Sequence, residues 1–156
     1  MVETIQKKII EIDELKLVGF RVLCSDDKYL EEIPKASRKL RERMNEIKQV
    51  VNPLLQYGAF VVENESPEED GYWVSVEVKE YKDIPTNMVT LTVPSQKYAV
   101  SRHKGANHQI INSYEELHRW INKNNYIRLK EKWHLEKFYS WNDTQNLDVD
   151  LLDTIK

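Results

Sequence analysis

The sequence has a single cysteine, only four glycines and no long apolar run. With Cys24 alone, no disulfide can form within the chain, and a two-cysteine redox motif is excluded. The scattered glycines form no glycine-rich phosphate loop. No apolar stretch approaches the roughly 18 residues needed to span a bilayer, and the first residues lack the apolar core of a signal peptide. We therefore expect a cytoplasmic protein that does not associate with membranes.

An excess of charge of one sign is also absent. The chain has 23 Lys and Arg against 26 Asp and Glu, interspersed, for a formal net charge of -3. A nucleic-acid-binding surface normally shows a clustered basic face, so we expect no direct contact with nucleic acid. With 156 residues, of which 40% are hydrophobic, the chain can bury one core of ordinary size. We predict a single domain over residues 1–156.

The four histidines do not follow a metal-binding pattern. His103 and His108 flank an expected strand-to-helix turn, His118 lies in a helical segment and His134 is distant in sequence. No HExxH spacing or carboxylate cluster accompanies them. We predict no metal site and no cofactor.

Apolar periodicity predicts two amphipathic helices. The first is expected over residues 29–51, where apolar side chains recur every three or four positions at Ile33, Ala36, Leu40, Met44, Ile47 and Val51. Pro53 favours an end there because the residue before a proline avoids the α region. The second helix is expected over residues 107–123, with a stripe formed by Ile110, Tyr114, Leu117 and Ile121. Each helix therefore has one face to bury against a sheet.

Segments rich in β-forming residues surround both helices. We expect strands at 17–23, 57–63, 72–81, 96–104, 133–140 and 147–153, with further extended segments at 6–12 and 89–94. The polar loop 64–71 joins two of them into an antiparallel hairpin. The order reads as two β-α-β-β units, at about residues 1–85 and 86–156. We predict a duplicated α+β fold in which pseudo-twofold symmetry relates two units, each with one helix on an antiparallel sheet.

Alternation along the strand at 72–81 separates its two faces. One face, expected to pack against a helix, carries Tyr72, Val74, Val76 and Val78. The other face carries candidates for ligand contact, namely Trp73, Ser75, Glu77 and Tyr81.

Four segments resemble a known family when they are taken together. They are residues 98–105 (YAVSRHKG), the helix stripe that ends in Trp120 and Ile121, residues 136–138 (EKF) and the closing strand 147–151 (LDVDL). The combination resembles the GyrI-like domains, the effector-binding domains of bacterial AraC-type and MerR-type multidrug-responsive transcription regulators. The resemblance covers the C-terminal half well, and the repeated order of elements extends it more weakly to the whole chain.

The resemblance implies a groove between the two halves, lined by aromatic side chains and containing one acidic residue, here Glu136. Family members use this acid to attract bulky cationic or aromatic compounds. A carboxylate in an apolar site is poorly solvated, so a lipophilic cation offsets its desolvation while stacking on the rings. The family commonly has Tyr two positions after the acid, whereas this chain has Phe138, so the hydrogen bond of that hydroxyl is in doubt here.

The other candidate ligand-binding residues also have a structural interpretation, because aromatic residues suit sheets and cores equally well. These candidates are Trp73, Ser75, Glu77, Tyr81, Tyr98 and Trp120. Glu77 is either a second pocket acid or an exposed strand carboxylate. Trp120 borders the apolar stripe of its helix and is either a core residue or part of a ligand cage.

The resemblance leaves three functions open. The first is a stand-alone protein that binds hydrophobic, cationic or aromatic small molecules without changing them, in transcriptional regulation or in the response to drugs and toxins. We expect no helix-turn-helix, because strand-like sequence begins within the first ten residues, so regulation would require a protein partner; a homodimer also stays open. The alternatives are a hydrolase of strained electrophilic genotoxins, with Glu136 as general base assisted by Glu77, and a gyrase-inhibitor-like protein.

Overall fold

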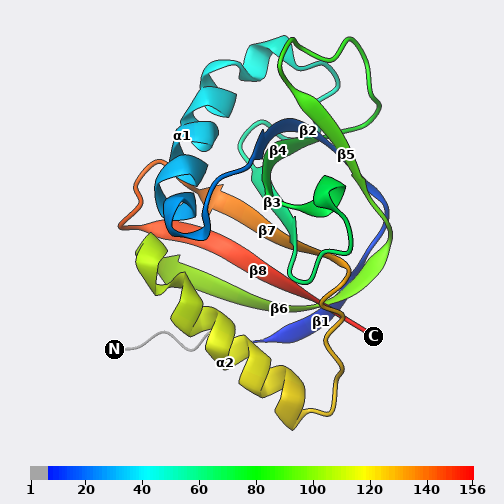
Figure 1. Ribbon diagram of the computed structural model, residues 1–156, viewed down its shortest axis with the longest axis vertical. Helices are drawn as coiled ribbons and strands as arrows, with labels where there is room; N and C mark the ends of the chain where they lie inside the picture. The colour runs from blue at the N-terminus through cyan, green and yellow to red at the C-terminus, as the bar shows by residue number, and fades with distance from the viewer. Residues whose placement is uncertain (1–6) are drawn as a thin grey trace.

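The computed structural model describes residues 7–156 as one eight-stranded sheet with two helices (Figure 1). The strands are β1 Lys8–Ile12, β2 Leu15–Val22, β3 Gln56–Val61, β4 Tyr72–Val78, β5 Val89–Val93, β6 Gln96–Gly105, β7 Trp133–Ser140 and β8 Leu147–Ile155. The helices are α1 Tyr29–Glu42 and α2 Ile110–Lys123, and four 3-10 turns are η1 Asp26–Lys28, η2 Met44–Glu46, η3 Pro67–Glu69 and η4 Asn107–Gln109. The predicted α+β class is confirmed.

The strand order across the sheet is β1-β6-β8-β7-β3-β4-β2-β5, and every neighbouring pair is antiparallel. The predicted hairpin is the β3–β4 pair. Both extended segments are edge strands, with β1 on β6 and β5 on β2, although residue 6 of the first segment lies outside the described residues. The twofold relation between residues 1–85 and 86–156 stays a prediction, which a superposition of the two halves would test.

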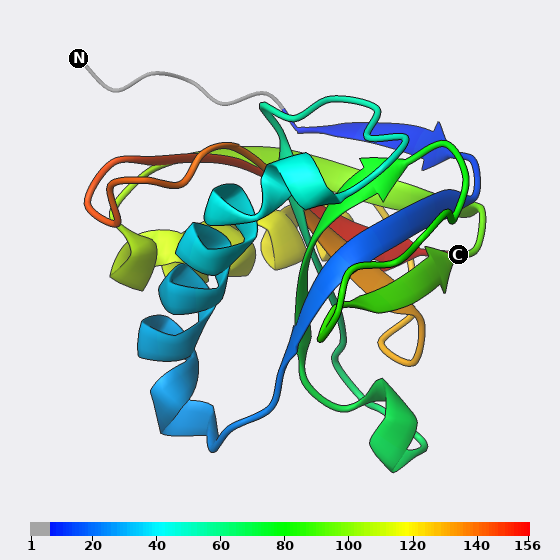
Figure 2. The same cartoon turned by 90° about the horizontal axis from the view of Figure 1, so that it is seen from above.

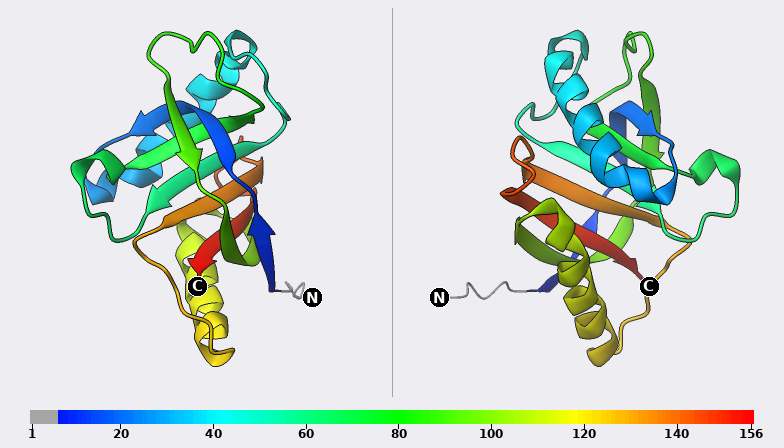
Figure 3. Two further views of the ribbon diagram at one scale, coloured as in Figure 1. Left: turned by 90° about the vertical axis from the view of Figure 1, so that its right-hand side faces the viewer. Right: turned by 60° about the vertical axis from the view of Figure 1, so that its left-hand side comes forward.

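Both helices lie on the same side of the sheet (Figure 2). The α1 helix packs on β2 and β4, whereas α2 packs on β6. Strands β7 and β8 therefore pass between the helices, as the right-hand view of Figure 3 shows. Within residues 7–156, neither helix is long and apolar enough to cross a bilayer. The neighbouring strands β3 and β7 therefore lie at the centre of the sheet, between the parts that the two helices cover.

Three apolar clusters hold the helices and the sheet together. Under α1, Leu40 packs with the helix-facing side chains of β4, which confirms the face expected for Tyr72, Val74, Val76 and Val78. Under α2, Leu117 and Ile121 pack with residues of β8. The third cluster lies on the opposite, concave face of the sheet and contains Leu17, Tyr57, Trp73, Tyr98, Leu135 and Leu152. The sheet is thus buried on both faces over most of its area.

The first helix ends earlier than the periodicity predicted. It stops at Glu42 rather than at residue 51, and a 3-10 turn follows it. Beyond that turn Ile47 is extended, Gln49 is left-handed with φ 65°, and Val50 forms a β-bridge with Val78. The backbone finds hydrogen-bond partners on β4 instead of in a helix. Ile47 nevertheless stays in the core under α1, so its apolar character was interpreted correctly while its secondary structure was not.

We predict that Leu117→Ala lowers the free energy of unfolding by about 2–5 kcal/mol, because it leaves a cavity in the core under α2. Leu117 has no exposed surface, whereas Ile111 on the same helix is 64% exposed. The matched control Ile111→Ala should change the free energy by less than about 0.5 kcal/mol. Urea unfolding of both variants measures the difference, and similar losses would show that α2 is not anchored through Leu117.

Candidate functional site

A cavity of about 810 Å³ opens between the two helices, above the centre of the sheet. Its walls come from η1 and α1 on one side, from η4 and α2 on the other, and from β3, β4 and β7. The lining residues are Asp26, Tyr29, Leu30, Ile33, Phe60, Val61, Val62, Asn64, Asp70, Gly71, Tyr72, Asn107, His108, Ile110, Ile111, Tyr114 and Glu136. Among these described residues there are three carboxylates and no lysine or arginine. The cavity is therefore apolar and aromatic with a negative charge.

Glu136 is the buried acid of this cavity. It lies on β7 with only 7% of its surface exposed. Its Oε1 accepts a hydrogen bond from the Tyr72 hydroxyl on β4, and its Oε2 accepts one at 2.6 Å from the Tyr114 hydroxyl on α2. Two phenols from elements far apart in sequence thus hold one carboxylate.

Burial raises the pKa of Glu136, and the hydrogen bonds from Tyr114 and Tyr72, together with the charge of His103, offset part of this increase. Burial, followed by the nearby carboxylate, also raises the pKa of both tyrosines well above the usual range, so both stay protonated donors. No ion pair to a lysine or arginine of residues 7–156 is formed by Glu136. Its charge is therefore hydrogen-bonded but not neutralised by a lysine or arginine of the described residues.

Gly58 makes room for this arrangement. It lies on β3 directly opposite Glu136 in the register of the sheet. A Cβ atom at this position would lie 1.7 Å from the Tyr72 hydroxyl oxygen, a separation that no side-chain contact allows. Any larger residue must therefore push the phenol away from the carboxylate.

Of the residues predicted from the sequence, only Glu136 lines the cavity. Phe138 shares its face of β7 but packs in the core under α2. Trp120 lies at the edge of the same core, with its ring stacked on Tyr126 at 5.9 Å between centroids. Both side chains support the helix that forms one wall of the cavity.

The remaining predicted residues lie away from the cavity, most of them on the opposite face of the sheet. Trp73 is buried there, edge-to-face with Trp133 at 5.1 Å, and Tyr98 is buried in the same cluster. The Ser75 hydroxyl donates a hydrogen bond to the carbonyl of Tyr57, and the hydroxyl of the exposed Tyr81 is hydrogen-bonded to Thr92. Glu77 is half-buried. Burial raises its pKa, and the nearby charge of Lys137 offsets part of that increase. Side chains alternate along β4, so Glu77 lies on the same face as Trp73, whereas Tyr72 and its partner Glu136 lie on the other face. The structure therefore does not bring Glu77 and Glu136 together.

Sequence reasoning did not select the residues that contact the acid. Tyr72 and Tyr114 were assigned to helix-facing positions, which is where they lie, but neither was proposed as a partner of Glu136. Phe60, which stacks on Tyr72 at 5.8 Å between ring centroids, was also missed. The available signal was a tyrosine on each apolar face, since a buried phenol hydroxyl usually requires a hydrogen-bond partner.

A family model described as Cass2, an integron-associated effector binding protein, matches residues 8–152. The chain belongs to this family. The match confirms the resemblance to effector-binding domains that the sequence indicated. A comparison with curated proteins found no match.

Solved structures share the fold of this effector-binding family member. The C-terminal domain of EcmrR is 19% identical with a TM-score of 0.70, covering 99% of each chain. SAV2435 bound to tetraphenylphosphonium is 18% identical with a TM-score of 0.70, covering 97% of this chain and 94% of that one. The integron cassette protein VCH_CASS2 of Vibrio cholerae is 16% identical with a TM-score of 0.60, covering 97% of each. In its complex with DNA the EcmrR chain is longer, and this chain spans 57% of it.

We predict that Glu136→Gln stabilises the fold at neutral pH, by about 0.5–2 kcal/mol, as is common when a strained site residue is replaced. Because the folded-state pKa of Glu136 is raised, ionisation above it is less favourable in the folded than in the unfolded protein. The gain should be present at pH 7, shrink as the pH falls below the folded pKa, and vanish below the lower pKa of the unfolded chain. Urea unfolding at pH 7 and pH 4 measures it, with the exposed Glu115→Gln as control; a loss of stability at pH 7 would contradict the prediction.

We also predict that Gly58→Ala costs about 1–3 kcal/mol, because the new methyl group displaces the Tyr72 phenol. In the double variant with Tyr72→Phe the ring must still move, because its Cζ lies 2.3 Å from the new Cβ, but the hydrogen bond to Glu136 is already absent. The cost of Gly58→Ala should therefore be smaller in that background than in the wild type. A double-mutant cycle by urea unfolding gives the coupling, and purely additive losses would show that the two residues do not interact.

Proposed function

We propose that the protein binds lipophilic organic cations in the cavity between α1 and α2, with Glu136 as the group that recognises charge. The observation that carries this proposal is a buried carboxylate held by two neutral phenols and by no lysine or arginine of residues 7–156. A cation that enters the cavity supplies the missing positive charge. The desolvation cost of the carboxylate is already part of the folded state, so the attraction is stronger than it would be in water.

The walls of the cavity suit the apolar part of such a ligand. Four aromatic side chains line it, Tyr29, Phe60, Tyr72 and Tyr114, and aromatic faces attract organic cations. At the mouth, the exposed apolar side chains Leu30, Val62 and Ile111 come from three different segments of the chain. The tetraphenylphosphonium bound to SAV2435 belongs to the same chemical class.

We further propose that the protein binds its ligand without changing it chemically. This binding would serve a regulatory response to drugs or toxins. The effector-binding family and the C-terminal location of the similar domain in EcmrR support a regulatory role. We propose a cytoplasmic location, where such ligands reach the protein after crossing the membrane. The hydrolase alternative places its general base at the same Glu136, so one variant tests both.

We predict that Glu136→Gln weakens the binding of tetraphenylphosphonium by about 5- to 150-fold, which corresponds to about 1–3 kcal/mol, and leaves neutral triphenylphosphine oxide much less affected. The amide keeps the size of the side chain and removes its charge. Phe60→Leu should weaken both ligands, because it removes aromatic surface. Isothermal titration calorimetry measures all the affinities.

Glu77→Gln is the matched control, because Glu77 lies on the opposite face of the sheet and should leave both affinities unchanged. Equal losses for the two ligands in Glu136→Gln would exclude this acid as the charge-recognising group. If the wild type consumes a strained electrophile that Glu136→Gln binds without turnover, the hydrolase interpretation replaces the binding one.

A further inference from the structure

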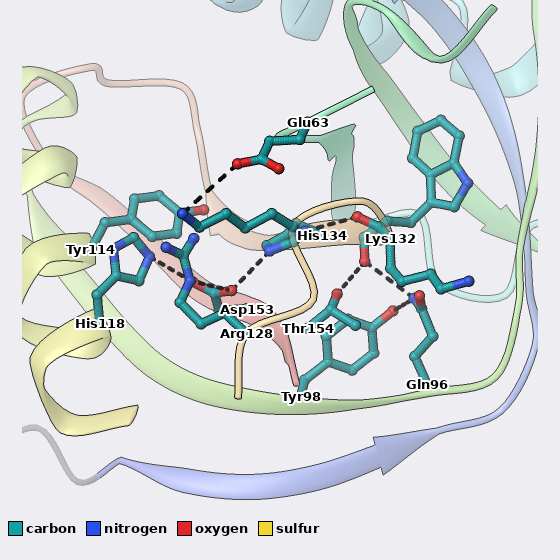
Figure 4. A network of polar contacts seen from close by, with 12 residues as sticks. Glu63, Gln96, Tyr98, Tyr114, His118, Arg128, Lys132, His134, Asp153 and Thr154 are labelled. Atoms are coloured by element: carbon teal, nitrogen blue, oxygen red, sulfur yellow. Dashed lines mark hydrogen bonds and ion pairs between the residues drawn. The ribbon is translucent and has the colours of Figure 1, made fainter. Parts of the chain in front are cut away.

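A second buried carboxylate, Asp153 on β8, lies behind the wall of the cavity (Figure 4). It has no exposed surface. Its Oδ1 lies 2.8 Å from Nε2 of His134 on β7, and its Oδ2 lies 3.1 Å from Nε of Arg128 and 2.6 Å from Nε2 of His118 on α2. The cation binding proposed above uses none of these four residues, which we call the Asp153 cluster.

The Asp153 cluster joins one carboxylate to three side chains that can carry positive charge, those of Arg128, His118 and His134. Burial alone would raise the pKa of Asp153, but its contacts with His118, His134 and Arg128 outweigh burial and hold that pKa well below the usual range. The ionised carboxylate therefore cancels the charge of Arg128. The Nδ1 of His134 faces the carbonyl oxygen of Lys132 at 3.0 Å while its Nε2 faces the carboxylate. Both oxygens can only accept, so His134 donates to both of them only when each ring nitrogen carries a proton.

His118 is the more exposed histidine of the cluster, with 32% of its side chain exposed against 1% for His134. Its Nε2 forms no well-directed hydrogen bond, although it lies 2.6 Å from the carboxylate oxygen. The attraction between them therefore depends on charge, and it is strongest when the His118 ring is protonated. His118 can exchange a proton with water while His134 and Asp153 stay buried.

Two chains of ring contacts join the Asp153 cluster to the cavity. In one, His134 stacks on Phe60 at 5.7 Å between ring centroids, and Phe60 stacks on Tyr72 at 5.8 Å. In the other, His118 lies against Tyr114 with ring centroids 5.8 Å apart, as Figure 4 shows. Both tyrosines donate to the carboxylate that recognises charge. The negative charge of Asp153 also reaches Tyr114, where it adds a minor contribution to the raised pKa of the phenol.

We propose that His118 and His134 set the charge selectivity of the cavity by linking cation binding to proton release, an inference that rests on the function proposed above. A proton on either histidine places positive charge behind the aromatic wall and disfavours a cation at Glu136. Cation affinity therefore falls as the pH is lowered through the histidine range. Linkage is reciprocal, so a bound cation releases protons from the cluster.

Other titratable and charged groups face the same region. His103 on β6 acts on Glu136, and the exposed His108 lies at the mouth of the cavity. Arg128 keeps its charge throughout this range, and Lys130 is paired with Glu63. Glu136 itself becomes protonated at low pH and weakens cation binding in the same direction. The test must therefore remove the titration of Glu136.

The experiment measures the binding of tetraphenylphosphonium to Glu136→Gln between pH 8 and pH 5.5. We expect the affinity to fall by about three- to tenfold, as for one unit charge across an aromatic layer. Adding His118→Gln should reduce this change to less than about twofold, whereas adding His108→Gln should leave most of it. Triphenylphosphine oxide should show no such dependence in any variant. The proposal is overturned if the affinity for tetraphenylphosphonium does not change with pH, or if its pH dependence is removed by His108→Gln and not by His118→Gln.

A second measurement uses the wild type, so it does not depend on how well the variants fold or bind. The NMR titration midpoint of the His118 ring should fall when tetraphenylphosphonium is bound and stay in place with triphenylphosphine oxide. An unchanged midpoint with the cation bound overturns the linkage and leaves the proposed function intact. Failure of both ligands to bind at every pH overturns the proposed function and the linkage with it.

Discussion

The structure depends on the burial of one carboxylate, Glu136, that pairs with no lysine or arginine of residues 7–156. Removing Glu136 from water is unfavourable, and the raised pKa of the group reflects this. Two phenol hydroxyls lower the cost, but they supply no charge. The resulting site is less stable than a neutral one of the same shape, and the same deficit makes it attractive to a cation. Stability and recognition are therefore opposed at this position.

The arrangement of the helices follows from the same constraint. Because α1 packs mainly on β2 and β4 while α2 packs mainly on β6, the central strands β3 and β7 lie between the two helices. The donors come from opposite sides of these strands, Tyr72 from the α1 side and Tyr114 from α2. Gly58 leaves free the space that the Tyr72 hydroxyl occupies beside the acid. The Asp153 cluster lies behind one wall of the cavity, where protonated histidines would oppose the cation binding that we propose.

Much of the fold could be predicted because the signals are local. Strand β7 begins and ends at the predicted residues, and the apolar stripe of α2 faces the core. The end of α1 could not be predicted from periodicity, because apolar residues also recur where the chain leaves the helix and bridges Val50 to Val78. For the site, the family resemblance indicated Glu136. The sequence-based prediction placed its aromatic neighbours on the face of β4 that carries Trp73, whereas they lie on the face that carries Tyr72. Both faces of β4 carry aromatic residues, and the sequence does not show which one borders a cavity.

The sequence by itself determined the two amphipathic helices and the strands, because these depend on neighbours a few positions apart. The acid on β7 was selected through the family resemblance. Only the tertiary structure decided that Tyr72 contacts a carboxylate 64 residues away, and that His118, Arg128 and His134 meet at Asp153. The protonation and charge of a buried group are set by all the atoms packed around it. Strand register and helix placement bring those atoms together from distant segments, so no local pattern in the sequence records them.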